Sequence, residues 1–144
     1  MMARTILGAL IVLLAMTQAA SAGGGSDISK YFNNTSLEVK ATDNPTQKRE
    51  ILRSSLETMT KALDKVESSA LVSAEDRTGA TLLRATLQEK QDELNGTNGF
   101  ERVADSQLNS FSDYVVQDMQ QADQYISVSL VALLLIIIVL ILIL

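Results

Sequence analysis

The sequence predicts an all-α protein: a small three-helix bundle, made of a helical hairpin and a long third helix, that continues into a single C-terminal transmembrane helix. Three observations lead to this prediction. Apolar residues recur at steps of three and four along much of residues 44–125, as they do on one face of a helix. Residues that cap helices precede these stretches. The final stretch, residues 126–144, carries no charge and no proline.

Residues 1–22 are predicted to be a secretory signal peptide. Arg4 precedes an apolar stretch that is too short to span a bilayer, and no cysteine is present to accept a lipid. The small residues Ala20 and Ala22 match the pattern that signal peptidase accepts. We therefore expect cleavage after Ala22.

Residues 23–43 are predicted to be a flexible N-terminal segment. They open on three glycines and a serine, a composition typical of flexible linkers. The apolar residues that follow are few and irregularly spaced. We expect no more than a short helix from Asp27, followed by a loop, before the exported helical domain at residues 44–125.

The first helix of the hairpin is predicted to begin after Asn44. Asn44 can cap the first free amides, Pro45 is favoured at the first helical position, and Gln47 stands where a capping box has Glu or Gln. The apolar stripe of this helix then follows the helical repeat: Leu52, Leu56, Met59, Leu63, Val66 and Ala70.

The second helix is predicted to begin after Ser73. Ser73 can act as the cap, and Glu75 and Asp76 follow at the positive end of the helix dipole. Asn95-Gly96 is a usual left-handed stop. The stripe is interrupted once, by Lys90, and its apolar members are Ala80, Leu83, Leu87 and Leu94.

The third helix is predicted to begin at a cap formed by Asp105 or Ser106. No proline or glycine separates Asp105 from Leu144, so we expect one continuous helix about 60 Å long, partly in water and partly in lipid. Its stripe leads directly into the apolar tail: Ala104, Leu108, Phe111, Val115, Met119, Ala122 and Ile126.

Residues 126–144 are predicted to be the transmembrane helix of a single-pass, type I protein. At about 1.5 Å per residue the segment reaches roughly 28 Å, close to the thickness of a bilayer core. Residues 23–125 then lie on the periplasmic or extracellular side. The alternative is a lipid-anchored surface protein precursor whose hydrophobic tail is removed, but the residues near Val115 and Met119 fit the required small-residue cleavage site poorly.

The composition argues against catalysis. The chain has no Cys and no His, which excludes disulfides, thiolate or imidazole metal sites and histidine-based triads. The acid pairs Glu75-Asp76 and Asp92-Glu93 are expected on exposed helix ends. The acids spaced by five cannot converge on one metal and are expected to be solvated: Asp113, Asp118 and Asp123. We expect no enzyme activity, no cofactor and no metal site.

The function predicted from the sequence is protein–protein interaction or scaffolding in the cell envelope. The expected partners are the lipid bilayer and either another envelope protein or a second copy, bound through the exported helices. A net charge of −5 argues against nucleic acid. If the helices leave their apolar seam open, the candidate interaction seam is Leu52, Leu56, Met59, Leu63, Leu83 and Leu87. The alternative, which the pattern favours, is that these residues are simply core.

Three Asn-x-Ser/Thr triplets bear on the source of the protein. They begin at Asn33, Asn34 and Asn95. In a eukaryotic secretory pathway they would be candidate glycosylation sites, whereas in a bacterium they carry no such meaning. A bacterial origin is the preferred interpretation.

Overall fold

The computed structural model describes residues 27–69, 72–122, 124 and 126–143, so the predicted signal peptide lies outside the described residues. No strand occurs within these ranges, and the all-α prediction is confirmed. The elements in order are α2 (Asp27–Ala41), α3 (Pro45–Glu67), α4 (Ala74–Asn95), the short 3-10 helix η1 (Asp105–Gln107), α5 (Leu108–Ala122) and α6 (Val128–Ile143).

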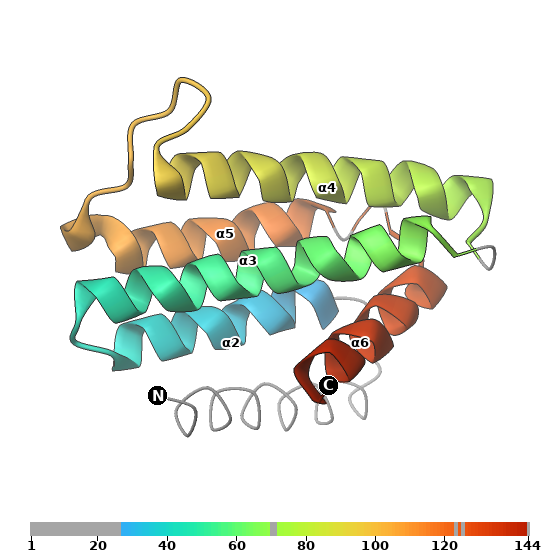
Figure 1. Ribbon diagram of the computed structural model, residues 1–144, viewed down its shortest axis with the longest axis horizontal. Helices are drawn as coiled ribbons and strands as arrows, with labels where there is room; N and C mark the ends of the chain where they lie inside the picture. Colours follow the sequence, from blue (N-terminus) through green and yellow to red (C-terminus); the bar gives the residue numbers. More distant parts are fainter. Residues whose placement is uncertain (1–26, 70–71, 123, 125, 144) are drawn as a thin grey trace.

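Helices α2 to α5 form a four-helix bundle with alternating up and down directions (Figure 1). Helices α2 and α4 both contact α3 and α5, which also contact each other. Their apolar faces meet in one shared core, which is how amphipathic helices of this length are stabilised. The prediction of a three-helix bundle was one helix short, because residues 27–41 form a full member of the bundle.

The predicted helix from Asp27 runs on to Ala41, so the expectation of a short helix in a flexible segment was wrong for these residues. Its length was underestimated because hydroxyl residues interrupt its apolar pattern. Thr35 bonds to Ser55 of α3, with 2.8 Å between the hydroxyl oxygens, and Ser36 bonds to Ser112 of α5 at 2.9 Å. These bonds satisfy polar groups that would otherwise be costly to bury. The buried residues of α2 are Ile28, Ser29, Tyr31, Phe32, Thr35, Ser36 and Val39.

The predicted starts of α3 and α4 and the predicted end of α4 are confirmed by their caps. Helix α3 ends at Glu67, and Ala70, which was expected on its apolar stripe, lies outside the described residues. The side-chain oxygen of Asn44 accepts a hydrogen bond from the backbone N–H of Thr46 at 2.9 Å. Ser73 Oγ accepts one from the N–H of Asp76 at 3.1 Å. Gly96, with a φ of 73°, closes α4 in the left-handed region that favours glycine.

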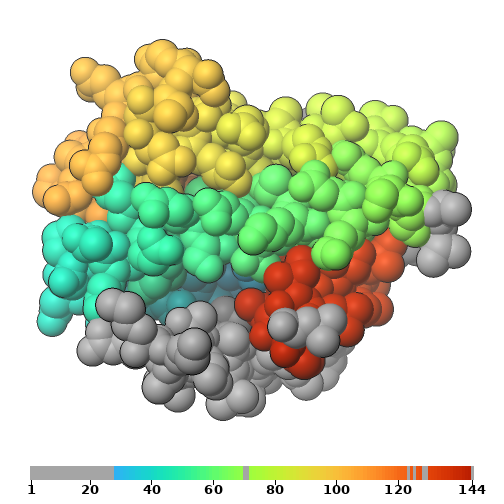
Figure 2. All heavy atoms as spheres, in the orientation of Figure 1, coloured from blue at the N-terminus to red at the C-terminus, as the bar shows by residue number. Residues whose placement is uncertain are grey.

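The prediction of one continuous third helix was wrong. Helix α5 ends at Ala122 and α6 begins at Val128, so the apolar tail is a separate helix. Ser127 starts it: its Oγ accepts a hydrogen bond from the N–H of Leu130 at 3.1 Å, which is the geometry of an N-cap. Helix α6 turns back and packs against α3 (Figures 1 and 2). Among the described helices, none is both long enough and apolar enough to cross a membrane.

Candidate interaction surface

The predicted interaction seam lies inside the bundle. All six of its side chains are fully buried, so in this fold they form core and offer no open surface: Leu52, Leu56, Met59, Leu63, Leu83 and Leu87. The fourth helix, α2, closes the bundle that three helices would have left open. A partner must therefore bind elsewhere.

Helix α6 presents the most apolar surface among the described residues. Its inner side is fully covered, with Leu130, Leu134 and Ile138 at most 1% exposed. Its outer side is equally apolar but faces outward, with Ile136, Leu140 and Ile143 exposed by 58%, 50% and 65%. These three recur at steps of four and three and so form one stripe, which we call the outer stripe of α6. Large exposed apolar patches mark sites of protein or membrane interaction.

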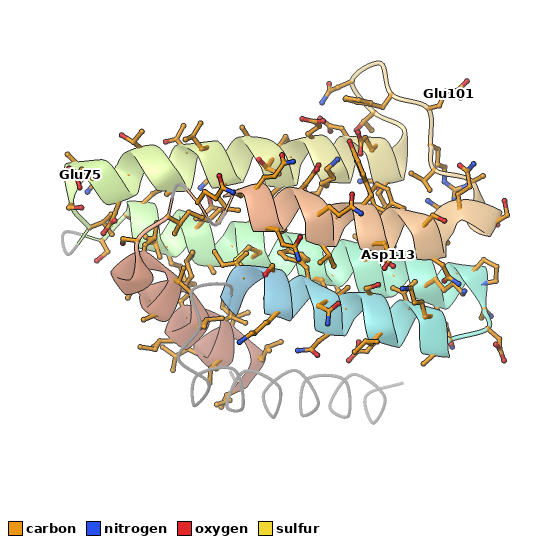
Figure 3. All side chains as sticks on the ribbon, turned by 180° about the vertical axis from the view of Figure 1, so that it is seen from behind. Glu75, Glu101 and Asp113 are labelled. Carbon is orange, nitrogen blue, oxygen red and sulfur yellow. The ribbon has the colours of Figure 1, made fainter. Side chains whose placement is uncertain are left out.

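The start of α6 is attached to the start of α4. Ser127 Oγ donates a hydrogen bond to Asp76 Oδ1 at 2.7 Å, in addition to capping its own helix. Asp76 is one of the adjacent acids expected at an exposed helix end. It is hydrogen-bonded to the residue that starts α6. Figure 3 labels its neighbour Glu75 at this end of the bundle.

A buried ion cluster joins α4 to α5. Lys90, which interrupts the apolar stripe of α4, is fully buried, with its Nζ 3.0 Å from Glu93 and 2.5 Å from Asp118. The same Nζ lies 3.7 Å from the ring centre of Tyr114. Burial by itself lowers the pKa of Lys90, but the hydrogen bonds to Asp118 and Glu93 outweigh it and raise the pKa above its usual value. The buried charge of Lys90 is thus paired, and its contacts with Asp118 and Tyr114 link α4 to α5.

The three acids spaced by five residues, which were expected to be solvated, differ in where they lie. Asp118 is not the solvated acid that we expected, because it pairs with buried Lys90. Asp113 is half exposed, but it accepts hydrogen bonds from Lys40 at 2.7 Å and Ser36 at 3.0 Å (Figure 3). The bond from Lys40 holds the pKa of Asp113 below its usual value. Asp123 lies outside the described residues.

The loop between α4 and η1, residues 96–104, protrudes from one end of the bundle (Figures 1 and 2). Its base is held by Asp92, whose carboxylate accepts hydrogen bonds from Gln88 at 3.1 Å and Thr97 at 2.8 Å. Hydrogen bonds, led by the one from Asn98, lower the pKa of Asp92. Phe100, farther along the loop, is 40% exposed. An acid near the C-terminus of a helix is normally unfavourable, and these bonds account for its position.

A buried arginine holds the other side of this loop. Arg49 of α3 donates hydrogen bonds to the carbonyl oxygens of Leu94 at 2.9 Å and Val103 at 2.7 Å. It also pairs with Asp105 at 2.9 Å. The prediction that Asp105 or Ser106 caps the third helix was therefore wrong: Ala104 occupies that position without a side-chain bond, and Asp105 is bound to Arg49. The sequence offered no signal for this long-range contact.

The candidate glycosylation sites lie on helices. Asn33 and Asn95 are exposed, and Asn34 is partly buried. The hydroxyl residues of the first two triplets, Thr35 and Ser36, are buried in helix contacts. Their use as acceptors stays a prediction that holds only for a eukaryotic source.

In the part of the chain that the structure describes, no group of three or more Asp or Glu residues is arranged to hold a metal ion. Comparison with protein-family models, curated proteins and solved structures finds no match for this chain.

Proposed function

We propose that this chain is a membrane-anchored helical protein of the cell envelope that acts by protein–protein interaction or scaffolding. The observation that carries the proposal is the outer stripe of α6. A helix on the surface of a water-soluble bundle normally has a polar outer side, as α5 does. Helix α6 has no polar side, since Ser129 is its single polar residue. Lipid is the medium in which every side of such a helix is favourably placed.

The bundle supports retention of the apolar tail over its removal. Cleavage in the region required by the lipid-anchor alternative would fall near Val115 and Met119. Both residues are buried in the core, at 1% and 0% exposure, within α5. Removing the chain beyond this point would take away part of the bundle itself.

The proposed interacting end is the loop at residues 96–104. Figure 3 shows Glu101 on this loop and Glu75 at the opposite end, where Ser127 and Asp76 hold the start of α6. With the tail in lipid, the loop would face away from the membrane at a distance set by α4, about 33 Å for its length. Asp92 and Arg49 fix the base of the loop, so binding through Phe100 would cost little ordering entropy.

Vesicle flotation of the full chain tests the anchor. Ile136 in α6 and Leu37 in α2 are both 58% exposed, so Ile136→Lys and Leu37→Lys are matched changes. A lysine in the middle of a membrane segment costs about 2.5–3.5 kcal/mol. We expect Ile136→Lys to reduce binding to phosphatidylcholine vesicles by roughly 100-fold and Leu37→Lys to leave it unchanged. Equal binding by both variants would contradict the anchor.

The scaffolding role needs a separate test. The protein extracted from its native membrane in mild detergent should migrate in a complex larger than one chain. Phe100→Ala should release it from that complex without changing its circular dichroism. A monomer in the native extract would contradict this role, and a mass that lacks the peptide around Ile136 would favour the lipid-anchor alternative.

A further inference from the structure

Helix α2 covers only part of α3. It has 15 residues, whereas α3 has 23, so at about 1.5 Å per residue it spans roughly 22 Å of about 34 Å. Tyr31 donates a hydrogen bond to the carbonyl oxygen of Ser55 at 3.4 Å, and Thr35 bonds to the Ser55 hydroxyl. The beginning of α2 therefore lies near the middle of α3, and the last turns of α3 extend beyond it.

Helix α6 packs obliquely across these last turns of α3. Figure 1 shows it beside the later part of α3, around and beyond the point where α2 begins, and in Figure 2 its atoms lie against those of α3. Ala62 lies two helical turns beyond Ser55 on the same side of α3, and it is fully buried. The inner side of α6 is buried as well, through Leu130, Leu134 and Ile138.

In the docked position only one side of the apolar surface of α6 is covered. Its inner side is covered by protein, while the outer stripe of Ile136, Leu140 and Ile143 stays exposed. In lipid both sides would be covered. The inner side cannot contact α3 and lipid at the same time, so docking and insertion exclude each other.

We propose that α6 is a two-position element, docked on α3 in the absence of lipid and released from α3 when it inserts. Insertion uncovers the last turns of α3 around Ala62 and thus couples membrane binding to exposure of an apolar face on the bundle. This inference rests on the proposed membrane function. The bond between Ser127 and Asp76 lies at the end of α6 that stays with the bundle in both positions.

Single cysteines can report on both positions, because the chain contains no cysteine of its own. The full chain would carry Ala62→Cys, Ile136→Cys or, as the control, Leu82→Cys on the exposed side of α4. Each variant would be labelled with a water-soluble maleimide, with and without phosphatidylcholine vesicles. Val66→Cys is a second probe of the same end of α3, in case Ala62→Cys does not fold.

Without vesicles we expect Ala62→Cys to react at least about tenfold more slowly than Ile136→Cys, since a minor open state is populated at 10% or less. Vesicles should speed labelling of Ala62→Cys by about tenfold or more and slow labelling of Ile136→Cys. Leu82→Cys should react equally in both conditions.

The outcomes separate the two proposals. If vesicles protect Ile136→Cys while Ala62→Cys and Val66→Cys stay unreactive, α6 binds lipid without leaving α3, and the two-position inference is overturned while the membrane function stands. If Ala62→Cys reacts rapidly without vesicles in a protein with unchanged circular dichroism, the docked position is overturned. If Ile136→Cys stays reactive and the chain does not float with vesicles, the membrane function fails, and the inference fails with it.

Discussion

Helices α5 and α6 follow each other in the chain and are nearly equal in length, 15 and 16 residues, but they are attached to the bundle by different means. Helix α5 buries one apolar side, exposes a polar side and forms ion pairs with α2 and α4 through Asp113 and Asp118. Helix α6 is apolar on all sides, and the polar side-chain contact shown for it is the one from Ser127 to Asp76.

This difference shows what the apolar pattern of a helix can encode. In α5 the alternation of polar and apolar residues specifies which side faces the core. In α6 nothing in the sequence separates Leu134, which is buried, from Ile136, which is exposed. The neighbours of α6 decide its orientation, and a different neighbour, such as lipid, can cover either side.

The largest expected effect concerns the ionic attachment of α5. Lys90→Ala removes the cation between Glu93 and Asp118, whose side chains are only 19% and 22% exposed. Leaving these carboxylates unpaired should lower the free energy of unfolding by about 3–5 kcal/mol, measured by urea denaturation. The exposed Lys61→Ala should change it by less than about 0.5 kcal/mol. Similar values for both variants would show that the cluster contributes little.

The apolar attachments of the two helices should also differ. Met119 of α5 and Leu134 of α6 are both fully buried. Met119→Ala should reduce the free energy of unfolding by about 2–5 kcal/mol through loss of core contacts. Leu134→Ala should reduce it by less than about 1 kcal/mol without lipid, because α6 can detach while the bundle stays folded. Equal losses in urea denaturation would mean that α6 is an integral part of the bundle.

A smaller effect is expected at the cap of α6. Ser127→Ala removes the bond that starts the helix and should destabilise it by about 1 kcal/mol. Hydrogen exchange at the Leu130 amide should then become about fivefold faster, with little change in global unfolding. Ser73→Ala, the equivalent change at α4, should instead lower the global stability by a similar amount. An unchanged Leu130 amide would contradict the role of the cap.

The smallest effect is expected at the exposed pair of Lys40 and Asp113, whose side chains are 43% and 52% exposed. Asp113→Asn should cost no more than about 1 kcal/mol at neutral pH. Because the folded-state pKa of Asp113 is lowered, its contribution is present above the unfolded pKa of about 3.9 and is lost as the pH falls through the folded pKa. At pH 6 the variant should therefore unfold at a lower temperature than the native chain, and in acid the two should unfold at the same temperature. Asp43→Asn, in the exposed loop before α3, should leave the temperature of thermal unfolding at pH 6 unchanged.

The parts of the fold that sequence reasoning predicted are those with local signals. The starts of α3 and α4 depend on caps only two or three residues from the groups they bind, and Asn44 and Ser73 both occupy the predicted positions. The end of α4 at Gly96 is equally local. The buried stripes of these helices followed directly from their spacing.

The parts that were missed depend on partners far along the chain. In the sequence Lys90 is only an interruption of an apolar stripe, because its partner Asp118 lies on another helix. Ser36 weakens the apolar pattern of α2, and the bond to Ser112 that allows its burial cannot be predicted from that pattern. The seam was a candidate surface only if the bundle left it open, and α2, whose full length had not been predicted, closes it. The cap at Ser127 was a local signal that could have been found, since serine at the start of an apolar run is a common N-cap.

The pairing of α2 with α5 also has a consequence for the order of folding. The hydroxyl groups of Ser36 and Ser112 are 76 residues apart in the sequence, whereas α3 and α4 are joined by a short turn. Contacts between distant residues form later, because a long loop must close before they can stabilise anything. Among helices α2 to α5, α2 leaves the ribosome first, but Ser36 has to wait for α5 before it finds its partner. The earliest of these four helices to be made is thus among the last to complete its contacts.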